Sequence, residues 1–289
     1  MKNQAILAID GGGTHCRAVL CDADGTEIGH ANGPYANLNT DFEQSCRHLE
    51  DLIDATYKTC EWTNHNRQGD VAVLGIAGAE IGDFASRLAD RLSFARISVM
   101  SDRDIAVAGV LADRDGILAQ SGTGSFFVRR HKGQTRHVGG WGLTLGDEAS
   151  GAWLGRELLR QTLLAHDGLI AQSPLTRAIM ARHGGRPDRL VIFAGSARPG
   201  DFAALAPELF DAFGDDDSVA RHVVGRGLAS LEHILTSLGA DDSDSLHVTG
   251  GIGARYRELM SAPFRSRLVA PAGDALSGAV SIGRDMLAD

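Results

Sequence analysis

Ile6-Leu-Ala-Ile-Asp-Gly-Gly-Gly-Thr14 is a short apolar run that stops at an aspartate followed by three consecutive glycines. The alternation in Cys16–Leu20, the Asp24-Gly25 pair and the extended Thr26–His30 indicate strand, loop, strand, turn and strand. The pattern returns at Ile117-Leu-Ala-Gln-Ser-Gly-Thr-Gly-Ser125, with apolar residues and glycines at matching positions. We interpret the two stretches as an internal repeat, so each half of the chain opens with a strand, a glycine-rich loop and a strand.

Strands and helices alternate along the rest of the chain, which is typical of an α/β protein. Apolar residues at helical spacing behind a Thr40/Glu43 capping box predict a helix from residue 42. Further predicted strands are 71–76, 97–100 and 246–248, and further predicted helices are 84–92, 105–111, 149–165, 175–181, 202–213, 219–238 and 275–286. We expect two lobes, residues 1–110 and residues 111–289. The second would carry a helical insertion, and its last helix would be free to pack back on the first lobe.

The composition is that of an ordinary globular protein. Hydrophobic residues make up 43% and charged residues 22% of the 289 residues, and the formal net charge is −9. This acidic balance disfavours nonspecific binding to nucleic acid or to an anionic membrane. No apolar run approaches the length of a membrane span, and the run that ends at Ile9 is too short for a signal-peptide core.

The four cysteines, Cys16, Cys21, Cys46 and Cys60, include no Cys-x-x-Cys pair. Ligation of zinc or of an iron–sulfur cluster is therefore not expected. Nothing in their spacing indicates a disulfide framework, which fits a reducing, cytoplasmic location.

The glycine-rich loops are the strongest indication of chemistry. Backbone N–H groups of Gly11–Gly13 could converge on phosphate oxygens, with the Thr14 hydroxyl as a further donor. Asp10 would repel a phosphate unless Mg²⁺ lay between them. The alternative is a plain hairpin turn, which needs fewer than three consecutive glycines. Ser121–Ser125 is weaker by itself, but as the repeat of the first loop it predicts a second phosphate loop.

Asp102 lies just beyond the strand Ile97–Met100, where α/β sheets place their ligands. Its carboxylate could accept a proton from an attacking hydroxyl, and with a pKa near 4 it would act mainly by position. It could instead be a helix N-cap, for which Ser101, Asp102 and Asp104 all qualify. The residues leave both interpretations open, and Asp104 is an alternative base.

Two further segments each allow two interpretations. Trp141 could stack on a sugar face while Asp147 accepts sugar hydroxyls. Alternatively, Trp141 is a core residue and Asp147-Glu148 an acidic pair in the first turn of a helix. Taken alone, these residues favour the second interpretation. Thr249-Gly250-Gly251 could contact adenosine through its backbone or form a close turn between a strand and a helix, and the sequence favours neither.

Taken together and in this order, these segments resemble the N-acetylglucosamine kinase and glucosamine kinase group of the BadF/BadG/BcrA/BcrD-type ATPase family, within the sugar kinase–actin superfold. The resemblance spans nearly the whole chain, and its specificity lies in the ordered set. The matching segments are Ala8-Ile-Asp-Gly-Gly-Gly-Thr14, Gly33-Pro-Tyr-Ala-Asn37, Gly75-Ile-Ala-Gly78, Ser101-Asp102, Ser121-Gly-Thr-Gly-Ser125, Gly139-Gly-Trp-Gly142, Leu145-Gly-Asp-Glu148, Thr249-Gly-Gly251 and Asp274-Ala-Leu-Ser-Gly-Ala279.

The resemblance implies two α/β, ribonuclease-H-like lobes with a central interlobe cleft, and transfer of the γ-phosphate of ATP to the 6-hydroxyl of an amino sugar. It implies that Asp102 is the catalytic base and that Asp10 handles Mg²⁺. The implied sugar contacts are Asn37, Asp102, Thr123, Trp141, Gly142 and Asp147. The implied nucleotide contacts are Gly11, Gly12, Gly13, Thr14, Thr123, Gly124, Ser125, Gly250 and Gly251.

Two departures from the family pattern stand close to these positions. Arg103-Asp104 follows the implied base where the family often has small residues, and Ala149 stands where many members have glycine. Leu163-Leu-Ala-His-Asp-Gly168 and Gly78-Ala-Glu80 resemble the bacterial glucosamine kinases, whereas Gly139-Gly-Trp-Gly142 resembles the N-acetylglucosamine enzymes. The acceptor is therefore expected to be glucosamine or N-acetylglucosamine, without a choice between them.

Two other functions are alternatives to an amino-sugar kinase. An activator ATPase of a radical dehydratase would need cysteines to hold an iron–sulfur cluster, and none follows Cys60. A sugar sensor or repressor would carry an N-terminal DNA-binding segment, whereas the first predicted strand begins close to the N-terminus. We expect ATP and a small sugar as partners, no nucleic acid, no membrane, and a homodimer.

Overall fold

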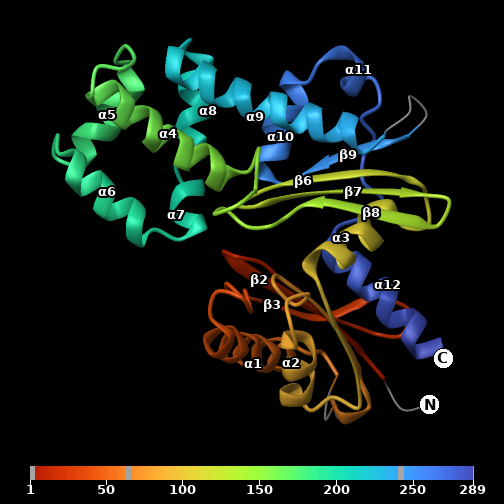
Figure 1. The fold of residues 1–289 in the computed structure, drawn as a ribbon. Helices are drawn as coiled ribbons and strands as arrows, with labels where there is room; N and C mark the ends of the chain where they lie inside the picture. Colours follow the sequence, from red (N-terminus) through yellow and green to blue (C-terminus); the bar gives the residue numbers. More distant parts are fainter. Residues whose placement is uncertain (1–3, 63–64, 66, 240–243, 289) are drawn as a thin grey trace. The chain divides into compact units, whose positions relative to one another are not determined.

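The computed structural model describes residues 4–62, 65, 67–239 and 244–288. The chain divides into two compact units: unit 1 consists of Met1–Arg114 and Pro271–Asp289, and unit 2 of Asp115–Ala270. Each unit contains one mixed β-sheet together with helices, which confirms the α/β prediction (Figure 1). The expected break after residue 110 falls inside helix α3 (Asp102–Leu111), and the division comes after that helix ends.

The sheet of unit 1 has the strand order β3-β2-β1-β4-β5. β1 pairs antiparallel with β2 and parallel with β4, and β4 pairs parallel with β5. The carboxyl ends of these three parallel strands therefore meet at one edge, where Asp10, Gly75 and Met100 lie side by side in the register. The strands are β1 (Ile6–Gly11), β2 (His15–Cys21), β3 (Glu27–Pro34), β4 (Val71–Ile76) and β5 (Arg96–Met100).

Helices cover both faces of this sheet, because successive residues of a strand point to opposite sides. Leu7 and Ile9 of β1 share a core with α1 (Phe42–Lys58) and α2 (Phe84–Leu92). Ala8 shares a second core with Ile105 of α3 and Ala279 of α12 (Ala275–Ala288). The short 3₁₀ helix η1 (Arg67–Gly69) leads into β4.

Helices α3 and α12 approach each other through glycine. A Cβ on Gly278 would lie 2.0 Å from the carbonyl oxygen of Ile105, and a Cβ on Gly109 would lie 1.8 Å from that of Asp274. Any side chain at either position would force the helices apart. This close packing fixes α12, the last helix of the chain, to unit 1.

The sheet of unit 2 has the order β8-β7-β6-β9. β6 pairs antiparallel with β7 and parallel with β9, as β1 does with β2 and β4, in agreement with the predicted repeat. The strands are β6 (Gly116–Ser121), β7 (Ser125–His131), β8 (Gln134–Gly139) and β9 (Leu246–Thr249).

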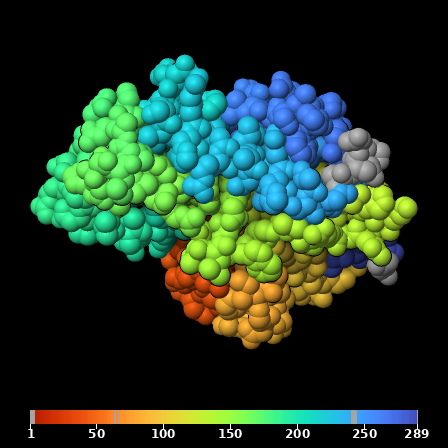
Figure 2. All heavy atoms as spheres, turned by 45° about the horizontal axis from the view of Figure 1, so that its top comes forward, coloured from red at the N-terminus to blue at the C-terminus, as the bar shows by residue number. Residues whose placement is uncertain are grey.

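Unit 2 is otherwise helical, and α5 to α8 gather at one end of it, drawn in green to cyan in Figure 1 and Figure 2. Buried leucines and valines of α4 and α9 form its core with Ile117 and Phe127 of the sheet. Within the described parts of the chain, no helix is long and apolar enough to cross a membrane. The helices are α4 (Gly151–His166), α5 (Pro174–Arg182), α6 (Pro187–Ser196), α7 (Pro199–Ala203), α8 (Ala206–Gly214), α9 (Ser218–Ser237), α10 (Gly251–Leu259) and α11 (Ala262–Arg265).

Several predicted boundaries were wrong. Asp41, not Thr40, caps α1, since its side chain accepts the N–H of Gln44 at 2.9 Å. The predicted helix 202–213 is two helices, α7 and α8, while α6 and α11 were not predicted. Helix α4 begins at Gly151 instead of residue 149, because Ala149 has a left-handed φ of 65°.

Candidate active site

The glycine-rich segment at the end of β1 is packed at its first residue and exposed beyond it. Gly11 is buried, and a Cβ there would lie 2.6 Å from the Ile76 side chain, so Gly11 is needed for packing. Gly13 and Thr14 are exposed, and a Cβ on Gly13 would meet no atom within 4 Å. The predicted phosphate loop therefore splits into a packed first glycine and an exposed turn whose N–H groups a ligand can reach.

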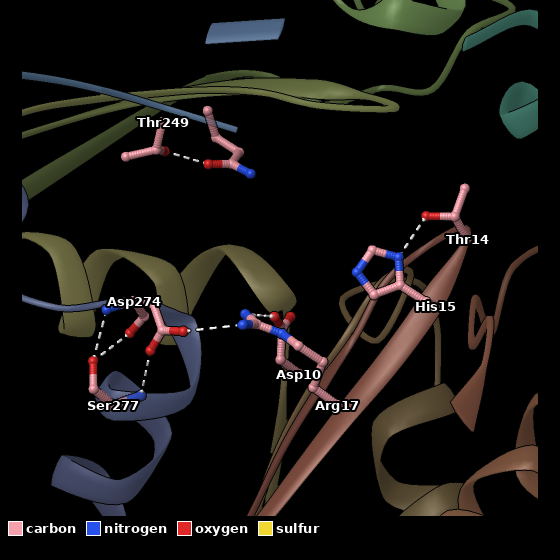
Figure 3. Close-up of polar contacts among 8 residues, drawn as sticks. Asp10, Thr14, His15, Arg17, Thr249, Asp274 and Ser277 are labelled. Carbon is pink, nitrogen blue, oxygen red and sulfur yellow. Dashed lines mark hydrogen bonds and ion pairs between the residues drawn. The ribbon is translucent and has the colours of Figure 1, made fainter. Parts of the chain in front are cut away.

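Asp10 at the end of β1 is held by an arginine that the sequence analysis overlooked. Arg17 Nη2 donates to Asp10 Oδ2 at 2.8 Å, and Arg17 Nη1 donates to Asp274 Oδ2 at 3.1 Å (Figure 3). Asp274 precedes α12, and its other carboxylate oxygen accepts the N–H of Ser277 at 3.0 Å. Arg17 therefore fixes the orientation of the Asp10 carboxylate. Asp10 and Arg17 are direct partners in the β1–β2 register, so the hairpin spacing could have revealed the pair.

Asp102 is the first residue of α3 and lies just beyond β5, at the edge of the sheet where Asp10 also lies. Burial raises its pKa to about 6, and the negative charges of Asp10 and Glu80 add to the rise. The positive charge of Arg103 and a hydrogen bond from Ser101 Oγ, 3.3 Å from Asp102 Oδ1, partly oppose it. Asp102 is thus a desolvated carboxyl group within electrostatic reach of Asp10.

Asp102 is not the N-cap of α3. Ser101 is the N-cap of α3, and its hydroxyl accepts the N–H of Arg103. Asp104 is exposed, whereas Asp102 is partly buried. Arg103, which stands where the family often has a small residue, forms an ion pair with Glu80 in the loop after β4.

Asn37 belongs to the same unit and is joined to the loop after β4. It forms an isolated bridge with Ala77, and its side-chain oxygen accepts the N–H groups of Asn39 and Thr40 at 3.1 and 3.2 Å. Because the oxygen is used in this turn, the amide NH₂ is the part of Asn37 suited to a ligand.

In unit 2, the second glycine-rich loop supports the start of α4. The carbonyl oxygens of Gly122 and Thr123 accept the N–H groups of Gly151 and Ala152 at 2.8 and 3.1 Å. Ser125 is buried, and its hydroxyl donates to the Glu148 carbonyl at 2.7 Å. The Ser125 side chain is therefore used inside the protein, which restricts its predicted nucleotide role to the main chain.

Asp147 lies directly against this loop. A Cβ on Gly124 would lie 3.0 Å from Asp147 Oδ2, and Asp147 itself is buried with a φ of 61°. A non-glycine residue in this conformation is strained, and such strain persists where the surrounding structure enforces it. The alternative role in the first turn of a helix was wrong, because α4 has no acidic residue in its first turn.

Trp141 is 75% exposed, so the core alternative was wrong. It lies between Gly140 and Gly142, both with φ above 70°, in the segment that joins β8 to Asp147. An exposed indole next to flexible glycines can present its face to a ligand.

Gly250 follows the end of β9 and packs against the end of β6. Its φ is 86°, and a Cβ there would lie 2.2 Å from the Ser121 carbonyl oxygen, so only glycine fits. Gly251 begins α10 and is exposed. Thr249 donates to Gln120 across β9 and β6, a second pair that the sequence analysis did not find (Figure 3). Unit 2 thus brings Gly124, Asp147 and Gly250 together at the ends of β6 and β9.

The acidic residues of unit 1 suit a metal ion that phosphate oxygens help to hold. Among the described residues, no three His, Cys, Asp or Glu side chains gather as a metal cage. Mg²⁺ commonly takes one or two carboxylates and completes its shell with water and substrate phosphates. Asp10 beside the open Gly13 turn matches that donor set.

The family model for the BadF/BadG/BcrA/BcrD ATPase family matches residues 7–261. The chain is 28% identical over 275 residues to glucosamine kinase GspK of Vibrio cholerae, covering 95% of this chain and 94% of the relative. It superposes with a TM-score of 0.89 and 31% identity on a Chromobacterium violaceum protein provisionally named an N-acetylglucosamine kinase, covering 97% and 99% of the two chains.

A third comparison concerns the fold alone. A glucokinase of the ROK family from Streptomyces griseus, solved with glucose and AMPPNP, matches with a TM-score of 0.59 at 16% identity and covers 97% and 99% of the two chains. The fold is therefore that of sugar kinases. Since the family model covers most of the sequence, this chain belongs to the BadF/BadG/BcrA/BcrD ATPase family.

Proposed function

We propose that this protein is an ATP- and Mg²⁺-dependent kinase that phosphorylates the 6-hydroxyl of glucosamine or N-acetylglucosamine. The observation that carries the proposal is the desolvated Asp102 carboxyl group, which shares the carboxyl edge of the unit 1 sheet with Asp10. The names of the relatives support the amino-sugar class, and the family supports the use of ATP.

Asp102 would act as the general base. With a pKa of about 6 it is ionised by about ten to one at pH 7, yet it is a stronger base than an exposed aspartate. As the sugar oxygen forms its bond to the γ-phosphorus, the bond from that phosphorus to the bridging oxygen of ATP breaks. The proton of the hydroxyl passes to Asp102. Phosphoryl transfer depends mostly on positioning and charge stabilisation, so a carboxylate of this strength suffices.

Asp10 would hold Mg²⁺, and the ion pair with Arg17 keeps its carboxylate in place. The bound metal would supply neutralisation of the phosphate charge. The N–H groups of the exposed Gly13 and Thr14 would point at phosphate oxygens. Gly12 is half-buried and donates its N–H to the His15 carbonyl oxygen at 3.2 Å, so its predicted contact would come from its Cα side of the turn, while Gly11 shapes the turn from inside the sheet.

The residues of unit 2 would complete nucleotide and sugar binding. Thr123, Gly124, Gly250 and Gly251 would contact the nucleotide, mainly through the backbone, and the buried Ser125 could do so only through its main chain. The sugar contacts would come from Asn37 in unit 1 and from Thr123, Trp141, Gly142 and Asp147 in unit 2. The interlobe cleft, the homodimer and the cytoplasmic location stay predictions.

The direct test is ADP release with a panel of sugars: glucosamine, N-acetylglucosamine, N-acetylmuramic acid, N-acetylmannosamine and glucose. Asp102→Asn is compared with the matched control Asp104→Asn, an exposed carboxylate two residues away on the same helix. We expect activity with one or both of the first two sugars. Loss of a positioned base lowers kcat by about 10²- to 10⁴-fold, and the control should retain most activity.

ADP release that no sugar stimulates would contradict the kinase proposal. Full activity of Asp102→Asn would remove Asp102 as the base, and loss of activity in Asp104→Asn would transfer that role to Asp104. Stimulation by glucose alone would retain a sugar kinase but remove the amino-sugar assignment.

A further inference from the structure

Unit 2 contains a pocket of about 530 Å³ between α4 and α9, away from the glycine-rich loops. Figure 2 shows the green surface of α4 and α5 next to the cyan surface of α8 and α9. Arg160, Arg226 and His222 contribute its basic side chains, and Leu164, Ile170 and Val219 contribute apolar surface. A pocket of this size with an apolar wall and a few polar groups is typical of small-molecule sites.

The two arginines are held in place by one carboxylate beneath them. Arg160 Nη1 and Arg226 Nη1 each donate to Glu157 Oε1 at 2.8 Å, and Gln161 Nε2 donates to the same atom at 2.8 Å. Glu157 is buried, while the arginine side chains are 58% and 48% exposed. Two guanidinium groups against one carboxylate leave a net positive charge at the mouth of the pocket.

The two arginines carry more N–H donors than their ion pairs with Glu157 use. Each guanidinium has five N–H donors, and the bonds to Glu157 use only the Nη1 atoms. Arg226 is further positioned 5.5 Å from the centre of the Trp153 ring. The remaining donors of both side chains are therefore preorganised for an anion, to which arginine can bind through two parallel hydrogen bonds.

Two acidic residues just before α9 do not cancel this charge. Asp217 caps the helix by accepting the N–H groups of Val219 and Ala220, and the positive end of the helix dipole offsets its charge. Asp216 forms an ion pair with Arg221, which does not line the pocket. His222 adds a ring N–H that can donate to an anion.

The pocket is distinct from the candidate active site. Gly151 at the start of α4 contacts the Gly122 loop. Arg160 comes nine residues later, which is about 14 Å further along the helix. None of the residues assigned to ATP or sugar lines the pocket.

We propose that this pocket binds a small organic anion. A phosphate or carboxylate group would lie between Arg160, Arg226 and His222, and the uncharged part of the ligand would contact Leu164, Ile170 and Val219. The site requires neither ATP nor sugar, so its test is independent of the kinase proposal.

The test is isothermal titration calorimetry of the full chain without nucleotide or sugar. The probes are glycerol 3-phosphate, phosphoenolpyruvate and citrate, with inorganic phosphate and uncharged glycerol as controls. We expect saturable binding of at least one organic anion with a dissociation constant below about 1 mM, weakening with salt. Arg160→Gln and Arg226→Gln should each weaken binding by about tenfold or more, because a charge-assisted hydrogen bond is lost.

The matched control is Arg221→Gln, which removes an arginine from the same helix one residue from His222. It also removes the partner of Asp216, but the Arg221 and Asp216 side chains are 58% and 72% exposed, so solvent and salt screen the released charge. The affinity should therefore stay unchanged within about twofold. If Arg226→Gln proves unfolded by circular dichroism, Arg160→Gln decides the outcome, because Arg226 and Gln161 still satisfy Glu157 in that variant.

Three results would overturn the proposal. The first is no saturable binding of any organic anion. The second is inorganic phosphate binding as tightly as the organic anions, which would leave the apolar wall without a role. The third is an equal loss of affinity in Arg221→Gln, which would mean that net charge and not this pocket attracts the ligand.

Discussion

Replacing Asp102 by asparagine should stabilise the protein while it removes the base. Burial and the charges of Asp10 and Glu80 raise the Asp102 pKa from 3.8 to about 6. Ionising Asp102 therefore costs more free energy in the folded protein than in the unfolded chain, and this lowers the stability of the fold. Each tenfold change in proton affinity is worth about 1.4 kcal/mol, so the full rise corresponds to about 3 kcal/mol. A neutral asparagine avoids this cost.

The sign of the effect depends on pH. Because the folded pKa lies above the unfolded one, Asp102 costs nothing below about pH 3.8, where both states are protonated. The cost grows as pH rises toward 6 and is complete above it. About 1 kcal/mol of this cost is already present at pH 4.5, so the stability difference between Asp102→Asn and the wild type should increase by about 2 kcal/mol between pH 4.5 and pH 7.5.

The measurement is urea unfolding at several pH values, followed by circular dichroism, with Asp104→Asn as the control. Asp104 is an exposed carboxylate on the same helix, so this variant controls for the loss of one negative charge there. A pH-independent difference for Asp102→Asn would show that Asp102 is not desolvated. A variant that becomes less stable relative to wild type as pH rises would show that Asp102 is stabilised as a carboxylate, and the proposed base would lose its physical basis.

Three further predictions concern other residues. Gly13→Ala should change the free energy of unfolding by less than about 0.5 kcal/mol, because the added Cβ would meet no atom. It should still raise the KM for ATP about tenfold, because the methyl group fills the space that a phosphate needs. An unchanged KM in steady-state kinetics would argue against this phosphate loop. Trp141→Ala should leave the melting temperature unchanged, since the indole is 75% exposed. It should raise the KM for the sugar about tenfold without affecting the KM for ATP. Equal changes in the two KM values would contradict sugar stacking. Tyr256→Phe should stabilise unit 2 by about 1 kcal/mol in urea unfolding, because the buried Tyr256 hydroxyl has no hydrogen-bond partner among the described residues; a loss of stability would reveal a partner for that hydroxyl.

The sequence was informative wherever a local pattern had a single physical meaning. The apolar run before Asp10 is a buried strand, and of the three glycines Gly11 ends that strand while Gly12 and Gly13 lie in the turn that follows it. The repeat at Ser121–Ser125 indicated a second sheet, and the two sheets share the same pairing around their first strand. The sequence was less informative at helix ends. Thr40 and Asp41 are both suitable caps for α1, and Ser101 and Asp102 are both suitable caps for α3, so only the packed chain selects between the members of each pair.

The site shows the same division. The sequence by itself determined the residue types of a phosphate loop and placed Asp102 at the end of a strand, since strand and turn signals act over a few neighbours. It left the choice between base and N-cap open, because a pKa depends on burial and on charges from β1 and from the loop after β4. The Arg17 bridge to Asp274 joins residues at opposite ends of the chain, and the Glu157 cluster joins α4 to α9. Only tertiary structure decides such contacts, because they depend on which distant segments pack together.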